Sequence, residues 1–252
     1  MEKNTFLIMN DLIYNLYHVE TLDQLKKDFL TKLKMLIPYS YASILLADEN
    51  EENGEIHFSS PICHPDYFSE AENEYIRLAD KDYLLWNLHS RESVLVKESD
   101  LIEDEKRLNA PLYEACYRKY NIFDSLQYTI VYQQKLLGVI TLFRTRADGV
   151  FSSDEMFYLR SLGMHLNSCM HTIRNARNET RKIPRECALR LKDMYQLTSR
   201  ETELLAQLFS FKSNEEISEA LGIQENTVQK HMQNIFRKLN VSSKWELLKF
   251  LS

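Results

Sequence analysis

Glycine is scarce in this 252-residue sequence, and its occurrences are widely separated: Gly54, Gly138, Gly149, Gly163 and Gly222. Glycines at these positions form neither a P-loop nor the G-x-G-x-x-G turn of dinucleotide-binding folds. The sequence also has no H-E-x-x-H or G-x-S-x-G motif and no histidine–cysteine cluster with metal-ligand spacing. His57 and His64 lie near Cys63, but such scattered residues are usually a chance arrangement. We therefore predict that the protein is not an enzyme and has no catalytic residue, metal or cofactor.

Cysteine is also sparse, and no C-x-x-C pair occurs among Cys63, Cys116, Cys169 and Cys187. Buried, reduced thiols in a cytosolic protein are the expected interpretation, with a redox switch as the alternative. No run of eighteen apolar residues occurs, and acid and amide residues interrupt the apolar patch at the N-terminus. These features predict a cytoplasmic protein without a membrane partner or a secretory signal.

The charge is unevenly distributed along the chain. Residues 181–252 contain twelve Lys and Arg against nine Asp and Glu, whereas residues 1–180 contain nineteen against twenty-eight. The acidic part would be repelled by a phosphate backbone, so contact with nucleic acid falls to the C-terminal part. The length suggests two domains, and a charged stretch with a proline, which does not continue a helix interior, marks the boundary. We predict a domain at 1–177, a linker at 178–190 and a domain at 191–252.

The sequence of the C-terminal domain contains N-terminal capping motifs for several short helices. In the S/T-x-x-E capping box, the hydroxyl accepts an amide proton three residues on and the carboxylate accepts one from the cap amide. Three pairs fit this pattern: Thr198 with Glu201, Ser213 with Glu216, and Ser243 with Glu246. Gly222 supplies a tight turn between the second and third of four predicted helices. Helix, glycine turn, helix is the helix-turn-helix signature, so this small all-α domain is predicted to bind double-stranded DNA.

The third helix has one apolar and one polar face. Val228, Met232, Ile235 and Leu239 form an apolar stripe toward the domain core, and His231 near it is expected to be structural. The opposite face carries amide and basic side chains that suit base edges and phosphates, although a merely solvated face is the alternative. Arg237, Lys238 and Lys244 are expected at phosphates rather than bases. The candidate DNA contacts are Asn226, Thr227, Gln229, Lys230, Gln233, Arg237, Lys238 and Lys244.

This domain resembles the LuxR/NarL family of bacterial transcription regulators. The matching positions are Leu197, Thr198, Arg200, Glu201, Leu205, Ser213, Asn214, Glu216, Ile217, Leu221, Ile223, Thr227, Val228, His231, Ile235, Lys238, Leu239, Val241 and Ser243. Phe211 departs from a usual glycine, Lys244 from a common arginine, and Gln224 from the usual serine cap, so Asn226 or Thr227 is expected to cap instead. Gln229 replaces a frequent lysine, so the sequence preference should differ. The resemblance implies a transcription regulator whose partners are operator DNA, RNA polymerase and a second copy of itself.

The first 177 residues alternate helices with strands that are paired by hairpins. Residues 4–17 and 22–37 are predicted to be helical, the second segment opened by a box of Thr21 and Gln24. Strands are expected at 41–47 and 55–59 around the turn Asn53-Gly54, at 94–97, and at 125–132 and 136–144 around the turn 133–135. Residues 69–88 and 111–119 should be helical, and Ser152 with Glu155 opens a long helix to about Asn178. The fold class is therefore α+β, an antiparallel sheet with flanking helices.

This order of elements, together with Leu136–Arg144 and Phe151–Glu155, resembles a GAF domain. The resemblance implies that a small molecule binds between the sheet and a helical insert, here Cys63–Leu88 with Leu112–Tyr120. The insert is rich in aromatic residues, which suit an amphipathic pocket but also fill ordinary cores. The candidate ligand-binding residues are Tyr67, Phe68, Asp82, Tyr83, Trp86, Tyr113 and Tyr117, with Trp86 favoured first.

The domain has three other possible interpretations. Its hairpins argue against a phospho-receiver, which needs parallel strands. An acyl-homoserine-lactone receptor has a similar length and an aromatic pocket, but its Trp-x-x-x-Tyr followed by Asp-Pro is absent. An empty GAF-like domain used only for dimerisation is the third possibility.

The long helix of the first domain carries a heptad pattern: Met156, Leu159, Gly163, Leu166, Met170 and Ile173. Such a stripe predicts a contact between two copies, with Phe157, Leu162 and Cys169 facing the sheet. The alternative is that the whole stripe packs on its own sheet, because two to three heptads are few for a coiled coil.

Overall fold

The computed structural model describes residues 3–49 and 55–251. The chain divides into two compact units, Met1–Ile173 and Arg174–Ser252, and each has its own hydrophobic core. No helix among the described residues is both long enough and apolar enough to cross a membrane.

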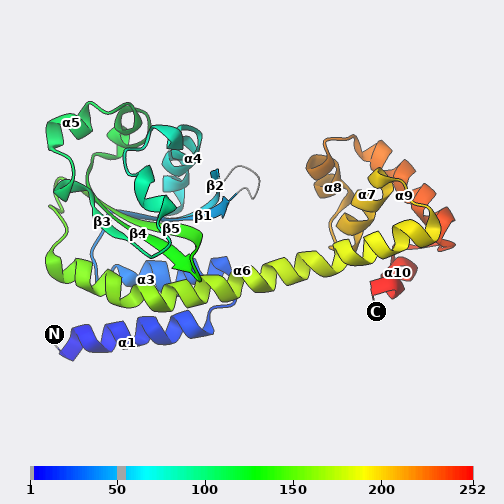
Figure 1. Cartoon of the computed structure of the whole chain (residues 1–252), viewed down its shortest axis with the longest axis horizontal. Helices are drawn as coiled ribbons and strands as arrows, with labels where there is room; N and C mark the ends of the chain where they lie inside the picture. The colour runs from blue at the N-terminus through cyan, green and yellow to red at the C-terminus, as the bar shows by residue number, and fades with distance from the viewer. Residues whose placement is uncertain (1–2, 50–54, 252) are drawn as a thin grey trace. The chain divides into compact units, whose positions relative to one another are not determined.

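The first unit is built on an antiparallel sheet, five-stranded within the described ranges, in the order β2-β1-β5-β4-β3 (Figure 1). The strands are β1 (Tyr41–Glu49), β2 (Ile56–His64), β3 (Leu95–Lys97), β4 (Ile122–Tyr132) and β5 (Lys135–Thr145). Both predicted hairpins are confirmed, since β1 pairs with β2 and β4 with β5. Gln133 and Gln134 turn the second hairpin with positive φ angles of 49° and 64°, as a tight two-residue turn requires. The predicted turn Asn53-Gly54 lies outside the described residues.

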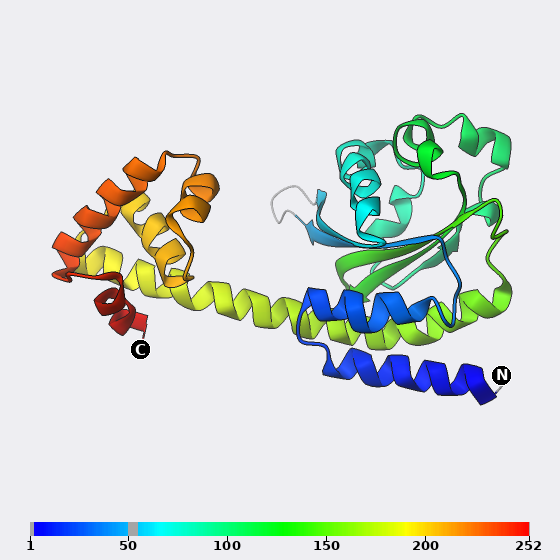
Figure 2. The same cartoon turned by 180° about the vertical axis from the view of Figure 1, so that it is seen from behind.

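One face of the sheet is covered by helices from both ends of the unit (Figure 2). These are α1 (Lys3–His18), a continuous segment of α2 (Leu22–Gln24), η1 (Leu25–Leu30) and α3 (Thr31–Leu33), and the first part of α6 (Ser153–Tyr195). The predicted box at Thr21 is confirmed, because its hydroxyl accepts from the Gln24 amide and the Gln24 side chain accepts from the Thr21 amide.

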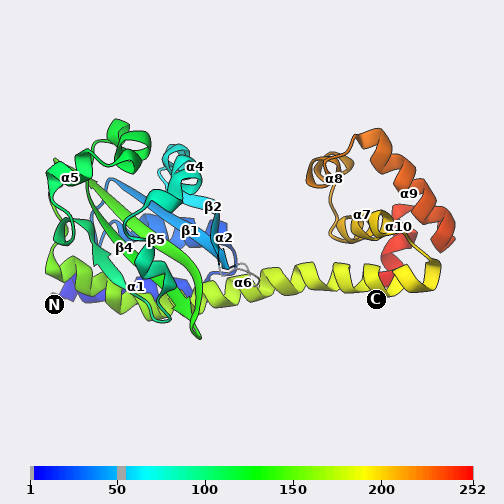
Figure 3. The same ribbon diagram turned by 45° about the horizontal axis from the view of Figure 1, so that its top comes forward.

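The other face carries the helical insert (Figure 3). The insert consists of η2 (Asp66–Phe68), α4 (Ser69–Leu78), η3 (Ala79–Lys81), η4 (Leu85–His89), η5 (Glu98–Asp100), α5 (Asp104–Leu108), η6 (Tyr113–Tyr117) and η7 (Arg118–Tyr120). Side chains of β1 alternate between the two faces: Ile44 and Leu46 pack under the outer helices, and Leu45 and Ala47 under the insert. The α+β class and the GAF-like plan of sheet, insert and flanking helices are confirmed.

The start of α6 is anchored by a buried arginine at the end of β5. Arg144 donates to the Pro38 carbonyl at 2.7 Å and forms an ion pair with Glu155 at 2.5 Å. Glu155 also accepts from the Ser152 amide at 2.8 Å, and the Ser152 hydroxyl accepts from the Glu155 amide, which confirms the predicted box. These bonds fix where α6 begins relative to the sheet.

The prediction that this helix ends near Asn178 is wrong. α6 runs from Ser153 to Tyr195 and contains Pro184, so the backbone of the predicted linker 178–190 is helical. A proline inside a helix costs about 3 kcal/mol. Beyond Pro184 the helix buries Cys187, Ala188 and Leu191 in the core of the second unit. Burial of these side chains offsets that cost, because full burial of a large apolar side chain such as leucine stabilises the fold by about 1.5–3 kcal/mol.

The prediction that the heptad stripe of α6 faces a partner is also wrong. Leu159, Leu166 and Met170 are fully buried against the unit's own sheet and outer helices. A Cβ on Gly163 would lie 2.3 Å from the ring of Tyr128 on β4, so the helix rests directly on the sheet at this point. Phe157, which was expected to face the sheet, is instead 59% exposed.

The second unit packs short helices onto the last part of α6. They are α7 (Ser199–Phe209), α8 (Asn214–Leu221), α9 (Glu225–Leu239), α10 (Lys244–Leu247) and η8 (Leu248–Leu251). The capping boxes of α7 and α8 are confirmed. At α10 the box is shifted: Ser243 accepts from the Glu246 amide, but the Glu246 carboxylate accepts from the amide of Ser242 at 2.7 Å. The predicted small all-α domain is thereby confirmed.

All four cysteines are buried and unpaired. Burial raises the pKa of the Cys63 and Cys116 thiols to about 12 and that of Cys169 to about 11. Because the thiolate is the reactive form, these side chains are inert packing elements, as the sequence predicts.

Candidate DNA-recognition surface and buried cavity

The polar face of α9 is exposed, whereas its apolar stripe is buried. Val228, Ile235 and Leu239 lie in the core of the second unit, and Met232 packs partly against them. The opposite face presents exposed polar side chains, all of which were predicted: Asn226, Gln229, Lys230, Gln233 and Arg237. Thr227 and His231 are half-buried beside the stripe. The helix therefore offers a row of amide and basic groups to a partner.

The turn before α9 has the geometry of a helix-turn-helix. Gly222 ends α8 in the left-handed conformation, with φ at 61°. Gln224 precedes α9 without a capping side-chain hydrogen bond, and its carbonyl accepts from the Thr227 amide at 2.8 Å. Asn226 and Thr227 both lie inside α9, so the expectation that one of them caps the helix is wrong. The last turn of α9 ends on Asn240, also left-handed, with φ at 54°.

Two of the predicted phosphate contacts are engaged within the unit. The Lys238 ammonium donates to Glu201 at 2.7 Å and to the Gln196 carbonyl at 3.0 Å. Burial opposes ionisation of Glu201, but Lys238 and Thr198 outweigh it and hold its pKa below the usual value. Lys238 thus joins α9 to α7 and is not a free phosphate contact. Lys244 donates to the Lys212 carbonyl at 2.9 Å.

Phe211, which occupies the position of a usual family glycine, has a left-handed backbone with φ at 60°. Its ring is 67% exposed. A non-glycine residue in this conformation is strained, because its Cβ approaches the following carbonyl. Position 211 therefore keeps the left-handed backbone that favours glycine, although phenylalanine occupies it.

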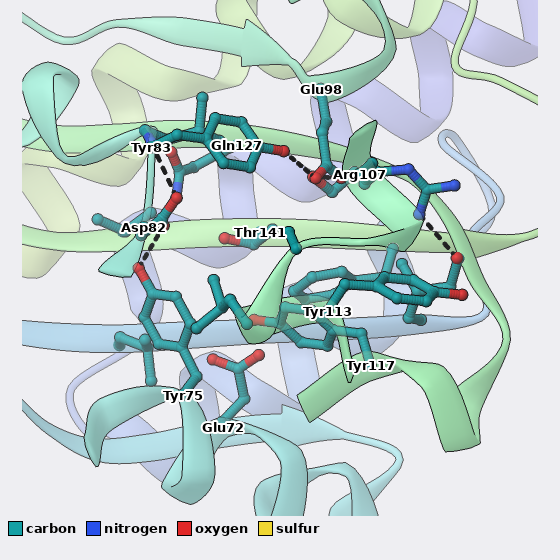
Figure 4. A pocket seen from close by; sticks show the side chains of 18 of the residues that line it. Glu72, Tyr75, Asp82, Tyr83, Glu98, Arg107, Tyr113, Tyr117, Gln127 and Thr141 are labelled. Atoms are coloured by element: carbon teal, nitrogen blue, oxygen red, sulfur yellow. Dashed lines mark hydrogen bonds between the residues drawn. The ribbon is translucent and has the colours of Figure 1, made fainter. Parts of the chain in front are cut away.

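A cavity of about 50 Å³ lies between the sheet and the insert of the first unit (Figure 4). Its floor is formed by side chains of β1, β4 and β5, and its walls by α4, η5, α5, η6 and the segment after η3. The polar and aromatic groups that line it include Glu72, Tyr75, Asp82, Tyr83, Glu98, Arg107, Tyr113, Tyr117, Ser125, Gln127 and Thr141. Since one water needs about 10–15 Å³ by this measure, the cavity has room for about three to five water-sized groups.

Three carboxyl groups line this cavity. Asp82 accepts from the Tyr75 hydroxyl and the Leu84 amide, each at 2.8 Å. Glu98 accepts from the Tyr83 hydroxyl and from the Ser125 hydroxyl at 2.9 Å. Burial raises the pKa of both groups. Each is therefore held by neutral donors rather than by a cation.

Glu72 is the third carboxyl group, and the hydroxyls of Ser43 and Tyr117 lie beside it. It is 1% exposed, and its Oε1 atom has no hydrogen-bond partner among the described residues. Burial raises its pKa to about 8. The side chain lies between the rings of Tyr75 and Tyr117 and points into the cavity (Figure 4).

The structure brings together some of the predicted ligand-binding residues and leaves out others. Asp82, Tyr83, Tyr113 and Tyr117 line the cavity. Trp86, favoured first, is 57% exposed and lies outside it, as does the exposed Tyr67. Phe68 is fully buried in the aromatic cluster behind the cavity wall, where it stacks on Tyr41 and contacts Tyr120 and Tyr117, and it does not line the cavity itself. None of the three side chains Trp86, Tyr67 and Phe68 therefore lines the cavity: the first two are exposed and the third is buried.

Sequence reasoning missed Glu72, Glu98 and Arg107. Glu72 and Tyr75 are three residues apart on α4, and this spacing puts both on one helix face, so a helical wheel could have paired them. Glu98 and Arg107 lie in short turns of the insert, where no periodic pattern marks a buried side chain.

Residues 195–251 match the profile described as "Bacterial regulatory proteins, luxR family". A related protein is the uncharacterized transcriptional regulatory protein YhcZ of Bacillus subtilis, 43% identical over 56 residues, 22% of this chain and 26% of that protein. The chain thus spans about a quarter of that relative's length. A similar solved structure is Escherichia coli SdiA, 17% identical, with a TM-score of 0.46 and coverage of 97% and 95% of the two chains. Another is the GAF domain of a sensor histidine kinase from Bacillus halodurans, 16% identical, with a TM-score of 0.42 and coverage of 63% and 99%.

Proposed function

We propose that this protein is a sequence-specific transcription regulator controlled by a small molecule in its first unit. The match of residues 195–251 to the luxR family of bacterial regulatory proteins supports the first part of this proposal. The exposed amide and basic face of α9, which follows the capped helix α8 and the Gly222 turn, is the single observation that best supports DNA binding. Operator DNA and, through it, RNA polymerase are the partners that this function requires.

The side chains of α9 divide between bases and phosphates. Lys230 and Gln233 project from the middle of the exposed face, where a helix in the major groove meets base edges. Lysine suits guanine O6 and N7, and glutamine suits adenine N6 and N7. Asn226 and Gln229 flank them, and Arg237 near the end of the helix contacts phosphate.

Selection of binding sites from random duplex DNA by the full chain tests this function. Enrichment of a defined sequence, followed by tighter binding of that sequence than of a scrambled duplex at the same salt concentration, is the expected result. No enrichment over the starting pool, or equal affinity for both duplexes, would contradict sequence-specific binding.

The buried cavity supports control by a ligand. A packed core places apolar groups in such a position, whereas this cavity collects three carboxyl groups, tyrosine hydroxyls and an arginine between the sheet and the insert. The test is to purify the protein natively from its host, to identify any retained small molecule by mass spectrometry, and to measure operator affinity with and without it. An operator affinity that no retained or added molecule changes would count against ligand control.

The size of the cavity favours one of the two alternatives over the other. Pockets for drug-sized ligands usually enclose about 300–1,000 Å³. A cavity of about 50 Å³ is far too small for an acyl-homoserine lactone without opening of the insert. It favours, as the second candidate, a GAF-like domain that stays empty and serves only dimerisation.

Binding as a homodimer is part of the proposal, with a contact other than the heptad stripe. Phe6, Leu7, Tyr14 and Tyr17 of α1 are all more than half exposed. A turn of 100° per residue places them within about 100° of one another on one helix face. Tyr17 bonds His165 of α6 at 3.0 Å, next to the exposed Met164. This apolar face suits a second copy in the same orientation.

Sedimentation of a Leu7→Asp, Tyr14→Asp variant tests the contact. Both side chains are exposed, so the fold is expected to persist while the dimer dissociates and operator binding weakens. Met35→Asp, an equally exposed apolar residue at another surface, is the matched control. Wild-type monomers at micromolar concentration, free and on DNA, would rule out the dimer.

A further inference from the structure

We propose that the cavity of the first unit binds a small organic cation, whose ammonium group pairs with the carboxylate of Glu72. The inference rests on the proposed control by a small molecule and names the chemical class of that molecule.

The charges around the cavity are unbalanced toward acid. Glu72, Asp82 and Glu98 line it, and Arg107 is the single basic residue of the lining. The Arg107 guanidinium already donates hydrogen bonds to the Ile122 carbonyl at 2.9 Å and to Asp104 at 3.0 Å. Its guanidinium also lies 5.1 Å from the ring centre of Tyr113. Among the described residues it therefore forms an ion pair with none of the three carboxyl groups of the cavity.

Glu72 differs from the other two acids in what surrounds it. Asp82 and Glu98 each accept two hydrogen bonds from neutral donors. Glu72 is the most deeply buried of the three, and although the hydroxyls of Ser43 and Tyr117 lie beside it, its Oε1 atom has no hydrogen-bond partner among the described residues. A buried polar atom without a partner is costly, and a carboxylate is best compensated by a cation that also donates hydrogen bonds. An ammonium group in the cavity supplies both.

The aromatic walls suit the same ligand. The rings of Tyr75 and Tyr117 flank Glu72, with their centres 6.5 Å apart. A cation within about 6 Å of an aromatic ring centre is attracted by the negative face of the ring, more strongly when it is desolvated. Leu45, Phe58 and Val139 belong to the apolar part of the lining, which can receive a short alkyl chain. An anion would meet three acids here, and a neutral apolar molecule would leave Glu72 unpaired.

The volume limits the ligand to a few atoms. Room for about three to five water-sized groups admits an alkylammonium of the size of propylammonium and excludes larger amines unless the insert opens.

Thermal unfolding of the full chain with three matched probes tests the proposal: propylammonium chloride, 1-propanol and sodium propionate at equal ionic strength. Propylammonium is expected to raise the unfolding temperature in a saturable way, and the other two probes are not. Glu72→Gln keeps the shape of the side chain and should abolish the saturable shift. Glu74→Gln, on the same helix but at an exposed carboxyl group, should retain it.

Each outcome bears on the proposal. No saturable shift with propylammonium, an equal shift with 1-propanol, or an undiminished shift in Glu72→Gln overturns it. If a variant unfolds at a different temperature without any probe, isothermal titration calorimetry measures its binding of propylammonium directly. Operator affinity is measured separately: if propylammonium binds without changing it, the cation site stands and ligand control fails. If a molecule of another class changes it, ligand control stands and the cation site fails.

Discussion

Replacing Glu72 by glutamine is expected to stabilise the first unit by an amount that grows with pH. Burial raises the pKa of Glu72 from 4.5 to about 8 in the folded protein. Between these values the folded state keeps a proton that the unfolded chain has released. The stability contributed by this proton is fully present below pH 4.5 and is lost as the pH rises to about 8.

The magnitude follows from this linkage. Each pH unit between the two pKa values changes the free energy of unfolding by about 1.4 kcal/mol, so the cost of Glu72 rises by about 3–4 kcal/mol from pH 5 to pH 8. Glutamine cannot ionise and avoids this cost. The difference in stability between Glu72→Gln and the wild type should therefore increase by about that amount over the same range. The contribution of Glu98, whose pKa burial also raises, cancels in the difference, whereas Asp82 is coupled to Glu72 through its charge and adds a smaller change of its own.

Urea unfolding at pH 5, 6.5 and 8 measures this difference. In a Trp245→Phe background, Trp86 is the single tryptophan and reports on the first unit. Glu74→Gln on the same helix, with an exposed side chain, should show a difference that does not vary with pH. A difference between Glu72→Gln and wild type that stays constant from pH 5 to pH 8 would refute the argument from burial.

The second unit provides further predictions. Lys230→Ala should cost about 1–3 kcal/mol on the selected operator and relax its sequence preference, whereas Arg237→Ala should weaken binding to all duplexes and reduce the salt slope by about one. Equal losses on operator and random DNA for Lys230→Ala would remove it from base recognition. Lys238→Met leaves the buried carboxylate of Glu201 without its cation, so the free energy of unfolding in denaturant should fall by about 2 kcal/mol at pH 7. This loss should shrink as the pH falls below 4.5, and a loss independent of pH would contradict the pairing. Phe211→Gly removes the left-handed strain and should raise stability by about 1 kcal/mol, and a destabilised variant would show that the exposed ring is packed.

Local chemistry explains what the sequence could predict. The boxes at Thr198 and Ser213 are complete within four residues, so their hydrogen bonds need no distant partner. The stripe through Val228 and Ile235 defines the exposed face of α9 by helix geometry alone. The exposure of this candidate face was predictable for this reason, whereas the contact made by Lys238 was not. Its partner Glu201 lies 37 positions earlier, and no local pattern joins them.

The features that the sequence missed depend on tertiary contacts. Pro184 signals a helix end, but the side chains after it are buried by α7 and α9, and that burial decides the outcome. The heptad of α6 is equally consistent with a partner helix and with a sheet, and only the approach of Gly163 to Tyr128 distinguishes them. The four-residue spacing of Asp82 and Trp86 predicts an acid and an indole on one side of a helix turn, but Trp86 lies in a short 3-10 helix that leaves it exposed.

The strand order sets a sequence of folding events. β4 and β5 are joined by a two-residue turn, so this central hairpin closes at little entropic cost. β1, however, pairs with β5 so that Ile44 lies opposite Ile140, and the whole insert must be looped out before this contact forms. Non-local pairing of this kind is slow and comes late. A chain emerging from the ribosome therefore holds its first hairpin unpartnered until β5 has been synthesised. The walls of the cavity close over the sheet only when that pairing is complete.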